Sequence, residues 1–234
     1  MADTEFKLQP DELKGLKRKM VIFPGAVLLL LAILVFLPAG TIHYWQAYVY
    51  MAVLLVPMVL VVSYFFKRDP RFLLRRLRLQ EREPEQKRIV SVSLLFFIAG
   101  YLVSGFDRRF GWSNVPAGIV IMANVLVLAG YLFIFAVFKV NRYASRVIQV
   151  DKDQTVITTG PYRIIRHPMY LGSIILFMFT PVALGSFWGV VPFIEVPVSL
   201  VFRILNEEKV LLEQLPGYKE YCTKVSYRLL PFFW

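Results

Sequence analysis

The sequence has few of the residues that proteins use to bind metals or to form disulfides. Its 234 residues include one cysteine, Cys222, and two histidines, His43 and His167. A single cysteine excludes an intrachain disulfide and a zinc site built on cysteines. With so few histidines, the ligands of other common zinc sites are missing as well. We therefore expect no metal.

Glycine motifs for nucleotide binding are also missing. No two glycines are spaced as Gly-x-Gly, and there is neither a Walker A loop nor a His-Glu-x-x-His segment. These absences exclude the dinucleotide fingerprint, the phosphate-binding loop and the helical zinc-protease site.

Charged residues are absent from long stretches of the chain. No Asp, Glu, Lys or Arg occurs from Met20 to Phe66, a run of 47 residues, and the mean hydropathy of the whole chain is +0.58. A membrane-spanning helix needs about 20 apolar residues, so this run predicts a hairpin of two spans that turns near residues 38–41. The chain contains six apolar segments, at about 20–38, 45–66, 89–106, 115–138, 168–184 and 187–202.

These segments predict the fold class. We expect an all-α, polytopic integral membrane bundle of about six transmembrane helices, with the last one continuing toward Leu215. No repeat or interdomain linker interrupts the chain, so residues 1–234 should form a single domain. Within it, residues 1–140 would supply the N-terminal spans.

The basic residues predict the orientation of the bundle. The net charge is +11, and 25 of the 27 Lys and Arg residues fall in segments that would share one side of the membrane, whereas Arg108 and Arg109 fall on the other. Positive charge favours the cytoplasmic side. We therefore expect both termini on that side, in contact with anionic lipids, and no binding of nucleic acid. The basic loop 67–88 could be an amphipathic helix on the headgroups or a solvated loop.

The most informative stretch is Gly160–Gly172, which leads directly into the fifth apolar segment. Gly160-Pro161 signals a turn, and Pro168 fits the first turn of a helix, so this span should begin at His167 or Pro168. The stretch offers aromatic rings, fixed positive charge and a histidine that can donate or accept a hydrogen bond. Together they suit a ligand with a flat base, hydroxyls and a carboxylate.

A second polar cluster follows the sixth apolar segment. Arg203 and Glu207 are four residues apart, so they share one helix face and could pair; Glu208 is their neighbour. In the functional interpretation, Arg203 holds a substrate anion and Glu207 holds hydroxyls or an ammonium group. Elsewhere, Asn124 is expected to make a helix–helix hydrogen bond, and the role of Glu195 stays open.

At this point the residues carry a family resemblance. The run 156–162 (Val-Ile-Thr-Thr-Gly-Pro-Tyr), the run 166–172 (Arg-His-Pro-Met-Tyr-Leu-Gly), the cluster 203–208 and the run 216–221 (Pro-Gly-Tyr-Lys-Glu-Tyr) resemble the isoprenylcysteine carboxyl methyltransferase family and related membrane phospholipid methyltransferases. The similarity covers roughly the last 95 residues, from Asn141 onward.

The resemblance implies that residues 141–234 bind S-adenosylmethionine on the cytoplasmic side without a Rossmann domain. It implies a catalytic or acceptor-binding role for Arg203, Glu208 and Arg166. It also implies cofactor binding by Gln154, Thr155, Val156, Ile157, Tyr162, His167, Pro168, Met169, Tyr170 and Glu207.

The leading hypothesis is a methyltransferase acting on a lipophilic small molecule or a lipidated cysteine carboxylate. A carboxylate is already ionised at neutral pH, so the protein would need only to align the reactants and exclude water. An amine acceptor, as in a phospholipid, would need a base, and Glu207 or Glu208 would be the candidate. Two alternatives from other classes are an NADPH-dependent sterol-type reductase and a non-catalytic membrane scaffold.

Overall fold

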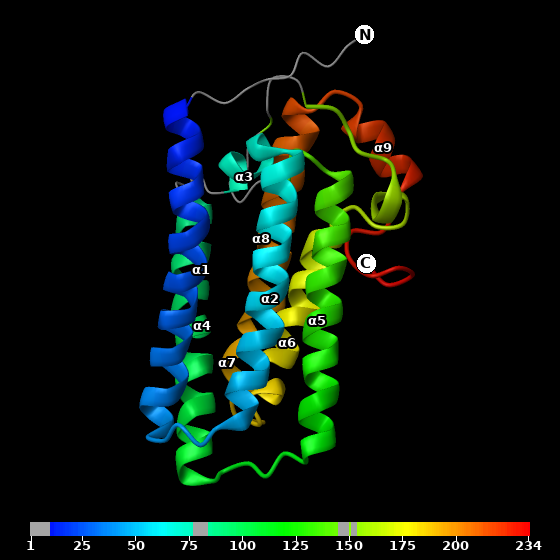
Figure 1. The fold of residues 1–234 in the computed structure, drawn as a ribbon. Coiled ribbons are helices and arrows are strands. Elements are labelled where there is room, and N and C mark those ends of the chain that lie inside the picture. The colour runs from blue at the N-terminus through cyan, green and yellow to red at the C-terminus, as the bar shows by residue number, and fades with distance from the viewer. Residues whose placement is uncertain (1–9, 77–83, 145–149, 151–153) are drawn as a thin grey trace.

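The computed structural model describes residues 10–76, 84–144, 150 and 154–234, and all regular elements in these residues are helices. The all-α fold class predicted from the sequence is therefore confirmed. The long helices α1 (Pro10–Ala39), α2 (Trp45–Arg68), α4 (Pro84–Phe110) and α5 (Ala117–Val140) run alongside one another through the length of the molecule (Figure 1).

These four helices are long and apolar enough to cross a membrane, and only 11–28% of the residues in their most apolar windows are buried inside the protein. Leu29, Leu60, Leu95 and Met122 are examples of large apolar side chains that point outward. Such an exterior suits a lipid solvent, in which helices satisfy their backbone hydrogen bonds internally. The chain is thus built as an integral membrane protein.

The expected turn between the first two spans is confirmed. α1 ends at Ala39, and Gly40 adopts a φ of 65°, a left-handed conformation that glycine reaches without steric cost. At the same end of the bundle, the Nη2 of Arg108 donates a hydrogen bond of 2.9 Å to the carbonyl of His43. Arg108 therefore ties α4 to this turn. Arg109, the other arginine predicted for this side of the membrane, follows it directly in α4.

Helix α6 (Pro168–Ala183) begins where the sequence predicted the fifth span, and it packs closely along α5. The two helices approach one another at Gly130 and Gly172. A Cβ added at Gly130 would lie 2.9 Å from the carbonyl oxygen of Gly172, and one added at Gly172 would lie 2.7 Å from a side-chain carbon of Ile134. Small residues permit this close backbone approach.

The sixth apolar segment is divided in the structure. α7 (Val190–Phe193) is followed at once by α8 (Glu195–Gln214), which runs well past residue 202 as expected. Pro197 has no N–H to donate to the carbonyl four residues earlier, which belongs to Phe193, the last residue of α7. This missing bond accounts for a break that hydropathy alone does not reveal.

Polar groups inside the bundle find partners on neighbouring helices. Tyr50 of α2 shares hydrogen bonds with Tyr101 of α4 and Thr180 of α6. Asn124 donates to the carbonyls of Val120 and Ala183 at 2.9 and 3.3 Å, so its predicted helix–helix hydrogen bond is confirmed.

The described part of the basic loop forms a short helix, α3 (Pro70–Arg76). Its Phe72 and Leu73 are buried, and Phe72 packs against Phe65 of α2 and Phe138 of α5. The apolar side of α3 therefore faces the protein. The rest of the loop, residues 77–83, lies outside the described residues.

Candidate active site

The structure has a cavity at the end of the bundle that holds α3, the last turns of α8 and helix α9 (Tyr218–Lys224) (Figure 1). It contains about 870 Å³ of empty space, part of which is open to the solvent. The predicted site residues that line it are Gln154, Thr155, Val156, Ile157, Tyr162, Arg166, His167, Met169, Tyr170, Arg203 and Glu207.

The remaining predicted residues, Pro168 and Glu208, are not among those lining the cavity. Pro168 starts α6 with His167 as its N-cap, as the sequence predicted. Glu208 is buried behind the lining residues, with 4% of its surface exposed.

The local fold brings the Arg-His-Pro run to the cavity. Gly160 has a φ of 58°, and residues Gly160–Arg163 form the single turn η1, with Pro161 near its start. The backbone N–H groups of Arg166 and His167 then donate to the carbonyls of Tyr227 and Arg228, both at 2.9 Å. The C-terminal tail thus fixes the two residues before α6 in place.

A hydroxyl joins the two predicted clusters at the start of α6. The Oη of Tyr170 donates to Glu207 of α8, and the Nε of Arg203 donates to the same hydroxyl at 3.1 Å. Arg203 and Glu207 were expected to share one face of a helix, and both contact one oxygen here. The arrangement leaves a carboxylate and a guanidinium side by side on the wall of the cavity.

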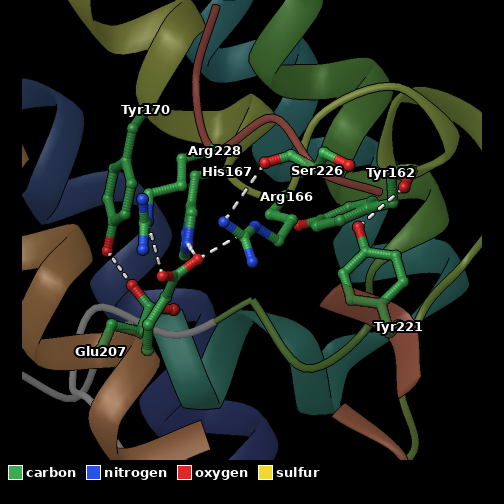
Figure 2. A network of polar contacts seen from close by, with 9 residues as sticks. Tyr162, Arg166, His167, Tyr170, Glu207, Tyr221, Ser226 and Arg228 are labelled. Carbon is green, nitrogen blue, oxygen red and sulfur yellow. Dashed lines mark hydrogen bonds and ion pairs between the residues drawn. The ribbon is translucent and has the colours of Figure 1, made fainter. Parts of the chain in front are cut away.

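Glu208 contacts Arg166, His167 and Arg228, and Figure 2 shows these three side chains close together. Its Oε1 is 3.1 Å from the Nε of Arg166 and 3.3 Å from the Nε2 of His167, and its Oε2 accepts a bond of 2.7 Å from the Nε of Arg228. Burial opposes ionisation, but the hydrogen bonds from His167 and Arg228 and the charges of His167 and Arg166 outweigh it and lower the pKa of Glu208. The carboxylate is therefore ionised at neutral pH and positions the cations around it.

Tyr162 is held at two points. Asn141, the residue after α5, donates from Nδ2 to the Oη of Tyr162 at 2.7 Å. The Oη of Tyr221 donates to the carbonyl of Tyr162 at 2.7 Å (Figure 2). Burial raises the pKa of Tyr162 to about 12, so its phenol is neutral.

Sequence reasoning missed several lining residues: Asn141, Tyr143, Ala144, Val210, Leu211, Leu215, Tyr218 and Tyr221. A signal existed for some of them. Leu211 continues the four-residue spacing that begins with Arg203 and Glu207, so it lies near them on one side of α8. Leu215, four residues further on, is the C-cap of that helix. The run 216–221 was quoted for the resemblance, but its two tyrosines were not assigned to the site.

Glu195, whose role the sequence left open, lies outside the cavity. Glu195 accepts a hydrogen bond of 2.8 Å from Ser93, and it does not line the cavity. Within the described ranges, no group of three or more His, Cys, Asp or Glu side chains could hold a metal ion.

Comparisons with known proteins show what part of the chain is similar to a known family. Residues 119–217 match the family model of phospholipid methyltransferases. The match begins within α5, before Asn141, and includes most of the cavity-lining residues. It confirms the predicted resemblance to the membrane phospholipid methyltransferases over this part of the chain. No curated protein sequence shows significant similarity to the chain.

Among solved structures, the chain is similar to a eukaryotic intramembrane Ras methyltransferase, an isoprenylcysteine carboxyl methyltransferase determined without a monobody. The alignment covers 92% of this chain and 85% of that one, with 16% sequence identity and a TM-score of 0.39.

Proposed function

We propose that the protein is an S-adenosylmethionine-dependent methyltransferase that methylates the carboxylate of a lipophilic acceptor such as an isoprenylcysteine. One observation carries the proposal: Arg203, Tyr170 and Glu207 form a polar group on the wall of a cavity where α8 emerges from the apolar bundle. The family match over residues 119–217 supports the reaction class.

The lining residues fit a sulfonium nucleoside. Glu207 offers a negative charge for the ammonium group or hydroxyls of such a ligand. Tyr162 offers a fixed aromatic ring, and the backbone of residues 154–157 runs along the cavity. Bound S-adenosylmethionine would supply a methyl group on a positively charged sulfur, which is open to attack by an oxygen or nitrogen nucleophile.

Arg203 would hold the acceptor carboxylate against that methyl group. One carboxylate oxygen forms the new bond to the methyl carbon, and the carbon–sulfur bond breaks with its electron pair left on sulfur. Because the carboxylate is ionised at neutral pH, no side chain has to remove a proton. Alignment and exclusion of water are then the protein's contributions.

Exposed apolar residues support a lipophilic acceptor. Phe202 and Leu205 are close to Arg203 in the sequence of α8, and 59% and 40% of their surfaces are exposed. An acceptor tail in the surrounding lipid could pack on these side chains while its head group reaches Arg203. The predicted position of this end of the bundle is the cytoplasmic leaflet.

The roles of Arg166 and Glu208 follow from their contacts. Both were expected to be catalytic, but Glu208 is held by Arg166, His167 and Arg228 outside the cavity lining. We assign Glu208 a positioning role through His167 and Arg166, which do line the cavity.

Methylation of a phospholipid amine is the second candidate, because the matching family model is that of phospholipid methyltransferases. An ammonium acceptor must lose a proton before it can attack. Glu207 is the carboxylate that lines the cavity, so it would have to serve as the base. Arg203 beside it would oppose the approach of a cationic head group, and this favours the carboxylate acceptor.

The test is transfer of a tritiated methyl group from S-adenosylmethionine to a lipid extract by the purified protein in lipid nanodiscs. A carboxyl methyl ester releases labelled methanol in alkali, whereas an N-methyl group does not. Alkali-labile product supports the proposal, and alkali-stable product supports the amine alternative. The absence of both transfer and S-adenosylmethionine binding would overturn the methyltransferase assignment, and binding of NADPH would then favour the reductase.

Two substitutions separate the roles on α8. Glu207→Ala should abolish cofactor binding measured by calorimetry, and Arg203→Ala should reduce turnover far more than cofactor affinity. The exposed residues Glu213 and Lys209 on the same helix provide controls of matched charge, so Glu213→Ala and Lys209→Ala should leave both quantities unchanged. Unaltered affinity in Glu207→Ala would contradict the role given to that carboxylate.

A further inference from the structure

Tyr218 carries a buried polar group with no partner. Its side chain lines the cavity, 4% of the residue's surface is exposed, and its Oη makes no hydrogen bond within the described part of the chain. An unsatisfied buried hydroxyl costs free energy, and such groups are rare in native structures. A hydroxyl on a cavity wall can escape this cost if it bonds a ligand.

The backbone holds Tyr218 firmly in place. Gly217 caps α9 with a φ of 82°, and the N–H of Tyr218 bonds the carbonyl of Leu215 at 3.2 Å. The Tyr218 ring packs against Tyr221, whose own hydroxyl is used by Tyr162. The Tyr218 hydroxyl is therefore a fixed feature of the cavity wall.

Several apolar side chains pack around Tyr218. It belongs to a buried cluster with Leu215, against which Val156 and Leu211 also pack. Because burial and the neighbouring carboxylates raise the pKa of Tyr218, its phenol stays protonated and can donate a hydrogen bond. The surroundings suit a flat, weakly polar ring that presents one acceptor atom.

The cavity changes character along α8. Arg203 and Glu207 are followed at four-residue intervals by Leu211 and by Leu215, the C-cap of α8, and all four line the cavity. At 1.5 Å per residue, this row extends for about 18 Å. One end of the row is charged and the other is apolar. An extended ligand with a charged end and an aromatic end would match this order.

We propose that Tyr218, Val156, Leu211 and Leu215 form a nucleobase subsite, in which the Tyr218 hydroxyl donates a hydrogen bond to a ring nitrogen of a purine. The inference rests on the proposed function, since the purine is the adenine of the methyl donor. The charged end of the ligand then lies toward Glu207, and the acceptor reaches the cavity beside Arg203.

The test compares Tyr218→Phe with Tyr221→Phe in the full chain, with S-adenosylhomocysteine as the probe in calorimetry. Tyr218→Phe should weaken binding about 3- to 10-fold, the effect of losing one hydrogen bond. It should not lower the melting temperature of the empty protein, because the hydroxyl has no partner to lose. Tyr221→Phe should lower that temperature, because the carbonyl of Tyr162 loses its donor.

Deaza analogues of S-adenosylhomocysteine identify the atom that accepts the bond. Among the 1-, 3- and 7-deaza compounds, the one lacking that nitrogen should bind the wild type and Tyr218→Phe equally. If Tyr218→Phe binds the unmodified probe as tightly as the wild type does, the subsite is overturned. If all three analogues keep the difference between the two proteins, the hydroxyl does not contact the base, which also overturns it. A wild type that binds no probe would instead refute the proposed function and the subsite with it.

Discussion

At the scale of the residue, Glu208 explains why the Arg-His-Pro run and the C-terminal tail act together. Arg166 and His167 precede α6, Arg228 lies in the tail, and all three meet one carboxylate on α8. A buried carboxylate is tolerated when such partners satisfy it, and removal of one partner from a buried ion pair is costly. The cluster thus joins three segments that are distant in the sequence.

Glu208→Gln should therefore destabilise the fold. The variant keeps the side-chain volume but leaves Arg166 and Arg228 without their counter-charge, at a cost of about 3 kcal/mol in the free energy of unfolding. A denaturant titration in detergent measures this cost. The exposed Glu213 on the same helix serves as the control, and Glu213→Gln should leave stability within about 0.5 kcal/mol of the wild type.

The same carboxylate predicts a pH dependence of stability. Because the pKa of Glu208 is lowered in the folded protein, its contribution is complete above the pKa of an unfolded glutamate, near 4.3, and is lost as the pH falls through the folded value. The stability difference between the wild type and Glu208→Gln should shrink as the pH is lowered through this window. A difference that stays constant down to pH 3 would contradict the interpretation.

At the scale of the element, the sequence predicted the helices well where charge marks their ends. The segment 45–66 became α2 (Trp45–Arg68), and 168–184 became α6 (Pro168–Ala183). Hydropathy predicts such boundaries because charged groups avoid the membrane interior. It could not predict the break between α7 and α8, which falls inside one apolar segment that contains only the charge of Glu195, and it gave no sign of the tail residues that pair with Arg166 and His167.

The crossing of α5 and α6 shows the same limit. Gly172 was recognised from its motif, but its partner Gly130 lies in an apolar segment with no distinguishing pattern. Only the structure shows that each glycine faces the backbone of the other helix. The position of the Arg-His-Pro run relative to α5 depends on this contact.

Gly130→Ala should destabilise the bundle. Its new Cβ would lie 2.9 Å from both the carbonyl oxygen of Gly172 and the backbone nitrogen of Leu176, and backbone atoms cannot move aside cheaply. We expect a loss of about 1–3 kcal/mol in the free energy of unfolding, measured by denaturant titration in detergent. Gly118→Ala is the control on the same helix, since nothing lies within 4 Å of its added Cβ. Equal stability of the two variants would refute the close approach.

At the scale of the whole molecule, the site was predictable as a set of residue types but not as a shape. The sequence indicated that residues 154–172 and 203–207 would meet, and the cavity contains both segments. The four-residue spacing relates Leu211 and Leu215 to Glu207, but it did not indicate that these leucines form an apolar end of the cavity. A ligand site needs apolar lining residues as much as polar groups. Which apolar residues line a cavity depends on how the chain folds, so the sequence alone does not identify them.

The orientation of the bundle is the remaining prediction at this scale. Positive residues gather at the end that holds the cavity, so this end should face the cytoplasm, where a soluble methyl donor is available. The α1–α2 turn lies at the opposite end (Figure 1) and should face the other side of the membrane.

Two single-cysteine variants test this orientation in a Cys222→Ser background, because Cys222 is the chain's one cysteine. Lys219→Cys lies on an exposed position of α9, and Ile42→Cys lies in the α1–α2 turn, where 69% of the Ile42 surface is exposed. A membrane-impermeant maleimide should label Ile42→Cys in intact cells and Lys219→Cys in inside-out vesicles. The reverse pattern would place the cavity on the non-cytoplasmic side, out of reach of the cytoplasmic methyl donor, and would contradict both the charge argument and the proposed reaction.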